Sequence, residues 1–266
     1  MLKRTLTALV LAAIGLPATI YGGVFFWLMM AFFLTFAAWE YTTLMRGAKW
    51  QPSAAITVSG VLAILIARTH YPAYESAVLT AAIFIAMIYH LITFERGRDQ
   101  AATDFAITVA GLVYMGWIGS YLVKLRALPD GVWWFFLVLP ATWLADSGAY
   151  FIGKNFGQRK LSPRLSPKKT WEGYWGGVFF GTLGGLFFAW LWRDHIPVSL
   201  LDGTLIGLAM ALLTTFGDLG ESMIKRQAKI KDSSHIFPGH GGVFDRIDTW
   251  LWASALGYYI ITWFFI

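Results

Sequence analysis

Long apolar segments occupy most of this chain, and they constrain its fold more than any other feature. A helix needs about 20 mainly apolar residues to cross the hydrocarbon core of a bilayer. Nine segments of about this length can be traced, at residues 5–21, 23–45, 53–68, 74–93, 103–123, 131–152, 174–192, 200–219 and 247–265. We therefore expect an all-α, polytopic integral membrane protein with about nine transmembrane helices.

The composition agrees with this expectation. The chain is 57% hydrophobic and 14% charged, whereas soluble domains are about 45–50% apolar and about 25% charged. It has no cysteine, which excludes disulfides and thiolate metal sites. The first segment resembles the core of a signal peptide, but the second follows almost at once, which favours an uncleaved first helix.

The basic residues are distributed unevenly over the connectors. With nine crossings, the N-terminus and the connectors after the second, fourth, sixth and eighth segments lie on one side of the membrane. That side holds 17 of the 21 Lys and Arg residues, and the other side holds only Arg68, Lys124, Arg126 and Arg193. The positive-inside rule therefore predicts a cytoplasmic N-terminus, and a bacterial inner membrane is the expected location.

The distribution of polar residues also divides the chain. Residues 1–130 are expected to form a scaffold of transmembrane helices that makes lipid or dimer contacts. Residues 131–266 are expected to form a catalytic transmembrane domain, because its two cytoplasmic connectors carry most of the charge.

The first of these connectors follows the sixth segment. Asp146 precedes Gly153 by seven residues, which places it roughly 10 Å inside the helix end. Ser166, Lys168 and Lys169 then bring a hydroxyl and two ammonium groups together, a composition suited to phosphate oxygens. Contact with anionic lipid headgroups is the alternative for the remaining basic residues of this connector.

The second connector continues the eighth segment into the cytoplasm. A helix that runs past Gly220 would carry one polar stripe with Glu221 alongside it. The members of the stripe are Asp218, Ser222, Lys225 and Lys229. The run Phe-Pro-Gly-His-Gly-Gly at 237–242 follows, and glycine-rich backbone of this kind can bind phosphate through its N–H groups.

Two further acids begin the last segment. Asp245 and Asp248 are three residues apart, so they share a helix face and repel each other unless a cation lies nearby. Carboxylate oxygens favour Mg²⁺. Simple complementation of the helix dipole is the alternative for this pair. Asp218, near the membrane on the preceding helix, favours a functional role because acids in membrane helices are costly.

These residues resemble the signature of a known family. The pattern consists of Ser222-x-x-Lys225-Arg226, Lys231-Asp232, Pro238-Gly239-His240-Gly241-Gly242 and Asp245-Arg246-x-Asp248. It is similar to the signature of the phosphatidate cytidylyltransferases, also called CDP-diacylglycerol synthases. The run from Ser166 to Gly173 matches the same family, and the resemblance covers roughly the last 120 residues.

The resemblance implies an activity and a set of partners. Members transfer CMP from CTP to phosphatidic acid, giving CDP-diacylglycerol and pyrophosphate for phospholipid biosynthesis, with Mg²⁺. CTP, phosphatidic acid and membrane lipids are therefore the expected partners, nucleic acid is not expected, and both a homodimer and a second cation are compatible with the pattern.

The resemblance also implies roles for particular residues. The expected metal ligands are Asp218, Asp245 and Asp248, with Asp146 and Glu221 as auxiliary candidates. The expected catalytic residues are Asp218, Asp245, Asp248, Arg246 and His240. The expected substrate-binding residues are Ser166, Lys168, Lys169, Ser222, Lys225, Arg226, Lys231, Gly241 and Gly242.

Two other classes of function are compatible with some of the same residues. Another membrane phosphotransferase or a lipid kinase is the alternative within enzymes, and a cation-coupled transporter is the alternative outside them. A transporter more often shows broken helices near the middle of the membrane and repeated halves, whereas the acids of this chain gather at the expected cytoplasmic ends.

The division of basic residues makes a prediction about topology. A cysteine introduced at Gln158 in intact cells should be protected from a membrane-impermeant thiol reagent, and one introduced at Ala127 should react, because the two positions lie on opposite sides of the membrane in the expected topology. Mass shifts of the purified variants measure the labelling. Reaction at residue 158 from outside the cell would contradict the topology.

Overall fold

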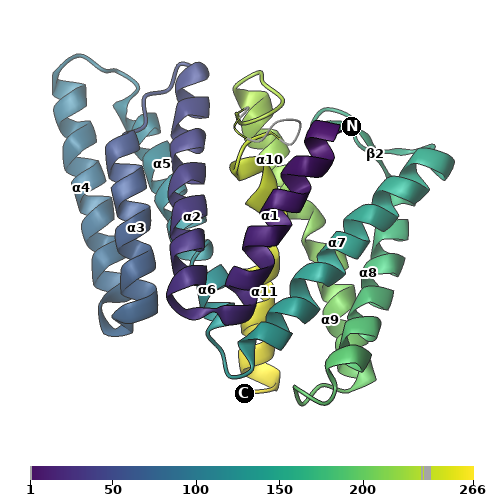
Figure 1. Cartoon of the computed structure of the whole chain (residues 1–266). Helices are drawn as coiled ribbons and strands as arrows, with labels where there is room; N and C mark the ends of the chain where they lie inside the picture. The colour runs from purple at the N-terminus through teal and green to yellow at the C-terminus, as the bar shows by residue number, and fades with distance from the viewer. Residues whose placement is uncertain (1, 235, 237–240) are drawn as a thin grey trace. The chain divides into compact units, whose positions relative to one another are not determined.

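The apolar segments of the sequence are helices in the structure. The computed structural model describes residues 2–234, 236 and 241–266 (Figure 1). The first half contains α1 (Leu2–Tyr21), α2 (Gly23–Gly47), α3 (Ala54–His70), η1 (Pro72–Tyr74), α4 (Glu75–Glu95), α5 (Ala101–Gly111), η2 (Leu112–Ile118) and α6 (Tyr121–Arg126). The second half contains α7 (Gly131–Phe156), β1 (Lys160–Ser162), β2 (Ser166–Thr170), α8 (Trp171–Trp192), α9 (Leu200–Leu213), α10 (Thr215–Gln227) and α11 (Phe244–Phe264).

Six helical segments of the described chain are long and apolar enough to cross a membrane. They are Gly23–Gly47, Pro72–Glu95, Ala101–Arg126, Gly131–Phe156, Trp171–Trp192 and Leu200–Gln227. Leu9–Tyr21 and Ala54–His70 are apolar but shorter, and the Trp, Tyr and Thr residues of α11 lower its hydropathy. The structure therefore supports an all-α membrane protein, while nine crossings and a cytoplasmic N-terminus stay predictions.

The chain divides into two compact units that do not follow the sequence order. The first unit contains residues Met1–Lys124 and Ile224–Ile247, and the second contains Leu125–Met223 and Asp248–Ile266. The first break lies close to the boundary expected at residue 130. The second connector groups with the N-terminal helices, which the sequence did not indicate. The scaffold and catalytic roles of the two expected regions stay predictions.

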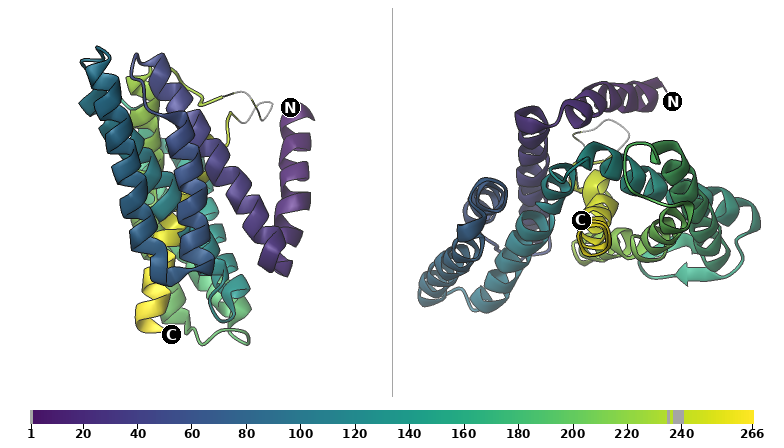
Figure 2. Two further views of the ribbon diagram at one scale, coloured as in Figure 1. Left: turned by 90° about the vertical axis from the view of Figure 1, so that its left-hand side faces the viewer. Right: turned by 90° about the horizontal axis from the view of Figure 1, so that it is seen from below.

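In the first unit, α2, α3 and α4 lie side by side with α5 and η2 (Figures 1 and 2). Leu34, Ile64, Leu112 and Met115 are fully buried between them. The packing is uneven, because α4 buries only 17% of its apolar span. Its outer face is therefore available to lipid.

One ion pair holds the connectors of this unit together. The buried Asp104 carboxylate accepts hydrogen bonds from Arg98 Nε at 2.7 Å and from the backbone N–H of Gln51 at 2.7 Å. Arg98 also donates to the carbonyl of Lys49. The hydrogen bond to Asp104 raises the pKa of Arg98 above its ordinary value, so this guanidinium stays charged at any physiological pH.

In the second unit, α7, α8 and α9 pack against one another through small residues. A side chain at Gly185 of α8 would collide with the backbone of Gly203 and Gly207 of α9. Small residues of this kind allow close helix approach in membranes, where the hydrophobic effect does not drive helices together. The close approach fixes α9, and therefore the start of α10, against α8.

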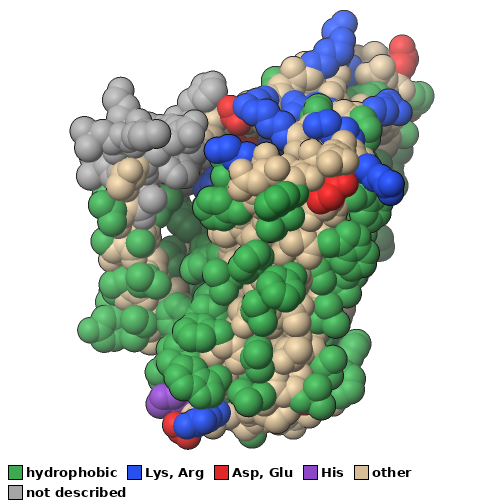
Figure 3. All heavy atoms as spheres, turned by 90° about the vertical axis from the view of Figure 1, so that its right-hand side faces the viewer, with side chains coloured by type: hydrophobic (Ala, Val, Ile, Leu, Met, Phe, Trp, Pro, Cys, Tyr) green, Lys and Arg blue, Asp and Glu red, His purple; other side chains and the backbone are tan. Residues whose placement is uncertain are grey.

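The face that carries α8 has an amphipathic distribution of side chains. Figure 3 shows hydrophobic side chains over its body and Lys and Arg side chains gathered at one end. Exposed basic residues at this end include Lys160, Arg164 and Lys168 of the β1–β2 region. Arg193 and Asp194 are exposed beyond the other end of α8. A wide apolar band between two charged ends is typical of a membrane-spanning unit.

The predicted eighth segment is interrupted near its end. The Thr214 hydroxyl donates to the carbonyl of Met210 at 2.7 Å, and the N–H of Gly217 donates to the carbonyl of Thr214 at 2.9 Å. The N–H of Gly217 therefore pairs three residues back along the chain instead of four, so one turn at the boundary between α9 and α10 is irregular. Because α10 ends at Gln227 and Lys229 has a positive φ of 58°, Lys229 lies outside the helical stripe expected for it.

The contact between α8 and α9 makes a prediction about stability. Gly207→Ala should lower the melting temperature in detergent, because the new methyl group would press on Gly185 and overpacking costs about 1–3 kcal/mol. Gly15→Ala in α1 is the matched control, since nothing lies within 4 Å of a methyl group there. Equal melting temperatures for both variants and the unmodified protein would contradict this account.

Candidate active site

Three carboxylates of the second unit lie together, two of them from the first half of α10 and one from the first turns of α11. Asp218, Glu221 and Asp248 each offer an oxygen, and these oxygens lie within 4.8 Å of one another. Glu221 is 1% exposed, and Asp218 and Asp248 are half-buried. Close like charges in a poorly hydrated place are costly without a cation. This arrangement of hard oxygen donors fits a divalent ion such as Mg²⁺.

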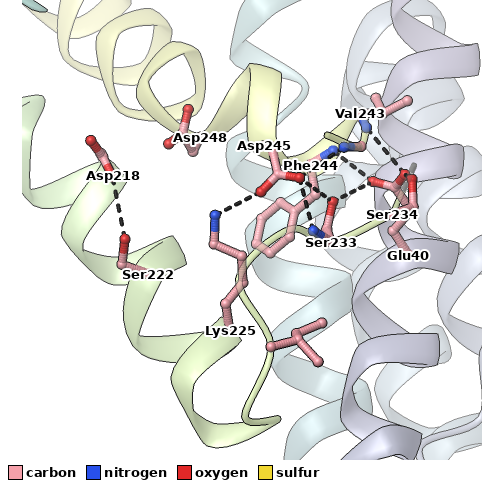
Figure 4. Close-up of polar contacts among 12 residues, drawn as sticks. Glu40, Asp218, Ser222, Lys225, Ser233, Ser234, Val243, Phe244, Asp245 and Asp248 are labelled. Atoms are coloured by element: carbon pink, nitrogen blue, oxygen red, sulfur yellow. Dashed lines mark hydrogen bonds and ion pairs between the residues drawn. The ribbon is translucent and has the colours of Figure 1, made fainter. Parts of the chain in front are cut away.

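Local hydrogen bonds orient two of these side chains. Asp248 Oδ1 accepts from the backbone N–H of Thr249 at 2.7 Å. Asp218 Oδ1 accepts weakly from Ser222 Oγ at 3.4 Å (Figure 4). Because Asp218 and Glu221 are three residues apart on α10, they occupy the same helix face. The local fold of α10 therefore places two of the three oxygen donors.

A lysine from the first connector reaches the same group. Lys169 lies in β2, and its Nζ is 2.5 Å from Asp218 Oδ2. The adjacent Thr170 ends the strand and caps α8 by accepting from the N–H of Gly173. Lys169 is thus held at a fixed point where the strand meets the helix, and it supplies one positive charge to the acidic group.

The connector that carries Lys169 is an ordered hairpin. The strands β1 and β2 pair antiparallel, and Glu172 in the first turn of α8 accepts from the backbone N–H groups of Gln158 and Arg159. Asp146 of α7 lies close enough to Lys169 and Asp218 to interact electrostatically with both. Asp146 therefore belongs to the same charged region, as an auxiliary to the three-carboxylate group.

In the first unit, Asp245 makes a different set of contacts. Its Oδ1 is 2.6 Å from Lys225 Nζ, and its Oδ2 accepts from the N–H of Ser233 at 2.8 Å and of Gly242 at 2.8 Å (Figure 4). The ion pair is largely buried, with exposed side-chain fractions of 12% for Lys225 and 5% for Asp245. These contacts satisfy the carboxylate within the protein, so the metal-ligand role expected for Asp245 stays a prediction.

Glu40 was not among the residues predicted from the sequence. It lies in α2, is 1% exposed, and accepts four hydrogen bonds from the second connector. The only sequence signal was an acid inside an apolar helix, a feature that often marks a functional site. Nothing in the sequence identified its partners, which are about 190 to 200 positions away along the chain and unpredictable from local periodicity.

The remaining predicted residues are placed as follows. Ser166 is half-buried in β2, while Lys168, Arg226, Lys231 and Arg246 are exposed. Arg226 donates to the carbonyl of Ile230 at 3.0 Å. Gly241 has a positive φ of 79°, which a side chain rarely tolerates. His240 lies outside the described residues.

The arrangement in the second unit is suited to chemistry on phosphates. An acidic group that can hold a cation lies beside the fixed Lys169, and Lys168 is exposed next to it in the same strand. Cations of this kind neutralise phosphate oxygens and stabilise the attacking and leaving oxygens of a displacement.

Comparison with known proteins gives a consistent result. Residues 2–264 match the sequence profile of the cytidylyltransferase family. A protein of Pseudomonas aeruginosa named phosphatidate cytidylyltransferase is 36% identical, over 96% of this chain and 98% of its own length. Proteins with the same name are 30% identical in Synechocystis, over 97% and 96% of the two chains, and 35% identical in Brucella suis, over 96% and 91%.

The matches extend over almost the whole chain, including the N-terminal helices in which the sequence signature itself was absent. This chain therefore belongs to the cytidylyltransferase family.

Proposed function

We propose that this chain transfers the cytidylyl group of CTP to phosphatidate, forming CDP-diacylglycerol and pyrophosphate. One structural observation carries the proposal: Asp218, Glu221 and Asp248 form a carboxylate group beside Lys169. The family membership and the shared name of the relatives support this substrate pair.

The reaction joins two anions. A phosphate oxygen of the lipid attacks the α-phosphorus of CTP, the new P–O bond forms, and the bond from the α-phosphorus to the bridging oxygen breaks so that pyrophosphate leaves with the bond electrons. Neither step requires a covalent enzyme intermediate. Positioning and electrostatic stabilisation by the protein then supply most of the acceleration.

The carboxylate group is proposed to hold Mg²⁺. Its donors are all hard oxygens, and their mutual repulsion gives it an affinity for a divalent cation. When bound, Mg²⁺ supplies charge neutralisation for the triphosphate. Asp218, Glu221 and Asp248 then act as its ligands, Asp146 as an auxiliary group, and Lys169 as a cation that contacts Asp218 and the nucleotide phosphates. The proposal also allows a second cation to bind at this site.

The other predicted roles also remain proposals. Ser166 and Lys168 are assigned to the nucleotide phosphates. Lys225, Arg226, Lys231 and the Gly241–Gly242 backbone are assigned to phosphate binding within the second connector, with Ser222, His240 and Arg246 organising it. The pairing of Asp245 with Lys225 supports an orienting role for this acid as well as the ligand role expected from the sequence.

The proposal includes a location. The carboxylate group should face the cytoplasm of a bacterium, at the inner membrane, where a membrane-anchored phosphate meets a water-soluble nucleotide. The uneven division of basic residues and the bacterial relatives support this placement. A homodimer formed through the N-terminal helices is also proposed, and the exposed apolar face of α4 is compatible with it.

Purified protein tests the proposal directly. Incubation with CTP labelled at the α-phosphorus, phosphatidate and Mg²⁺ should release pyrophosphate and transfer label to lipid, with no product when phosphatidate is replaced by diacylglycerol. In a parallel reaction with CTP labelled at the γ-phosphorus, transfer of label to diacylglycerol would instead identify a lipid kinase. Absence of any product with phosphatidate would contradict the proposed function.

Loss of one carboxylate should separate metal binding from folding. Asp248→Asn should lower nucleotidyl transfer about 100-fold or more, the scale expected when one electrostatic contact in a transition state is removed. It should leave the melting temperature in detergent without Mg²⁺ equal to or above that of the unmodified protein, because the repulsion is relieved and asparagine keeps an oxygen for the N–H of Thr249. Melting curves and transfer assays on the same preparation measure both effects.

A structural role for Asp248 predicts the reverse pattern. The folded fraction of Asp248→Asn would then be active but less stable than the unmodified protein, and this outcome would refute the metal site. Asp202→Asn is the matched control, since Asp202 belongs to the capping box of α9. That variant should lose stability and keep its activity per folded molecule.

Lys169 should act on nucleotide binding. Lys169→Ala should raise the KM for CTP about tenfold, because one hydrogen bond to a charged group is lost, while changing the KM for phosphatidate much less. Lys160→Ala is the matched control, as Lys160 is an exposed lysine of the paired strand. Steady-state kinetics with each substrate varied in turn measure the effect. Equal KM values for CTP in the two variants would contradict the assignment.

A further inference from the structure

The Glu40 carboxylate joins two segments of the second connector, both of which are about 190 to 200 positions away from it along the chain. Its Oε1 accepts from Ser234 Oγ and from the N–H of Val243 at 3.1 Å. Its Oε2 accepts from Ser233 Oγ at 3.1 Å and from the N–H of Phe244 at 2.7 Å. Each oxygen therefore holds one serine hydroxyl from the 233–234 segment and one backbone N–H from the 243–244 segment (Figure 4).

These contacts require a carboxylate. All four partners are neutral donors, and two of them are backbone N–H groups that cannot become acceptors. A carboxylate offers two acceptor oxygens, whereas an amide offers one oxygen and an NH₂ group. In either orientation, an amide at this position would face a backbone N–H with another donor, and a buried donor without a partner is costly.

The surrounding residues are fitted to the same carboxylate. A methyl group added at Gly242 would collide with both oxygens of Glu40 and with Ser233 Oγ. Next to Glu40 in α2, Tyr41 packs edge-on against Phe244. The position of Glu40 thus explains why residue 242 is a glycine, independently of any role of that residue in binding phosphate.

Ser233 connects the contacts of Glu40 to the charged residues of the connector. Ser233 Oγ lies 3.1 Å from Glu40 Oε2 and 2.9 Å from Asp245 Oδ2. Asp245 in turn holds Lys225 and the N–H of Gly242. A displacement of Ser233 would therefore be transmitted to a lysine and a glycine that the sequence assigns to phosphate binding.

We propose that Glu40 is a positioning residue for the reaction: by clamping the 233–234 and 243–244 segments together, it fixes Lys225 and the Gly242 backbone for binding substrate phosphate. The inference rests on the proposed function and extends it to α2, a helix expected to serve only as scaffold. Glu40 itself does not contact substrate in this account, because its oxygens are occupied by the four donors.

The test compares Glu40→Gln, Glu40→Asp and the control Glu95→Gln. Glu95 ends α4 and is exposed. Glu40→Gln should raise the KM for CTP about tenfold, with a smaller change in kcat, because one of the two backbone N–H groups loses its acceptor. Glu40→Asp should not restore the KM, since its shorter side chain cannot reach both segments. Glu95→Gln should match the unmodified protein.

A second measurement is independent of catalysis. In Glu40→Gln without substrate, trypsin should cut after Lys231 several times faster than in the unmodified protein, and it should cut after Arg159 of the other unit at an unchanged rate. Mass spectrometry of the peptides gives both rates. A general loss of fold would instead increase both cuts and lower kcat with an unchanged KM.

The outcomes separate the two proposals. Absence of pyrophosphate release by the unmodified protein defeats the proposed function, whatever the proteolysis shows. An active unmodified protein, together with a Glu40→Gln variant of unchanged KM and unchanged cleavage after Lys231, defeats the role of Glu40 alone. Equal acceleration of both cuts shows that Glu40 serves only the stability of the fold.

Discussion

The mutual repulsion of Asp218, Glu221 and Asp248 is the constraint on which the account of this protein depends. Three carboxylates with oxygens within 4.8 Å of one another would be unfavourable at the end of a membrane helix unless cations offset their charge. Lys169 offsets part of it through its ion pair with Asp218. The remaining negative charge supports the proposal that the group binds a divalent cation.

The folds of both units serve to hold charged groups in place. In the second unit, the glycine contact between α8 and α9 positions the start of α10, and the cap at Thr170 positions Lys169. In the first unit, Glu40 and Asp245 hold the two segments of the second connector. In each unit, a buried or half-buried acid takes its orientation from backbone N–H groups, which are rigid donors with fixed positions.

The sequence predicted the parts of this structure that depend on local patterns. Apolar runs gave the helices because a membrane-spanning segment must satisfy its own backbone, and the pairing of Asp218 with Glu221 followed from helical periodicity. The hairpin β1–β2 was not predicted, because proline disfavours regular backbone. In the structure Pro163 lies in the turn between the strands, and Pro167 lies within β2 itself. Glu40 was missed because its partners are remote in the chain. The break between α9 and α10 was missed because the apolar composition of a segment does not register one irregular turn.

Direct measurement of metal binding tests the central claim. Mn²⁺ added to the purified protein in detergent, without nucleotide, can be followed by the loss of its free-ion electron paramagnetic resonance signal, with Mg²⁺ as competitor. The account predicts saturable binding that Mg²⁺ displaces and that Asp218→Asn greatly weakens, while Asp202→Asn leaves it unchanged. Binding of equal affinity in the unmodified protein and in Asp218→Asn would contradict the claim that these carboxylates form the metal site.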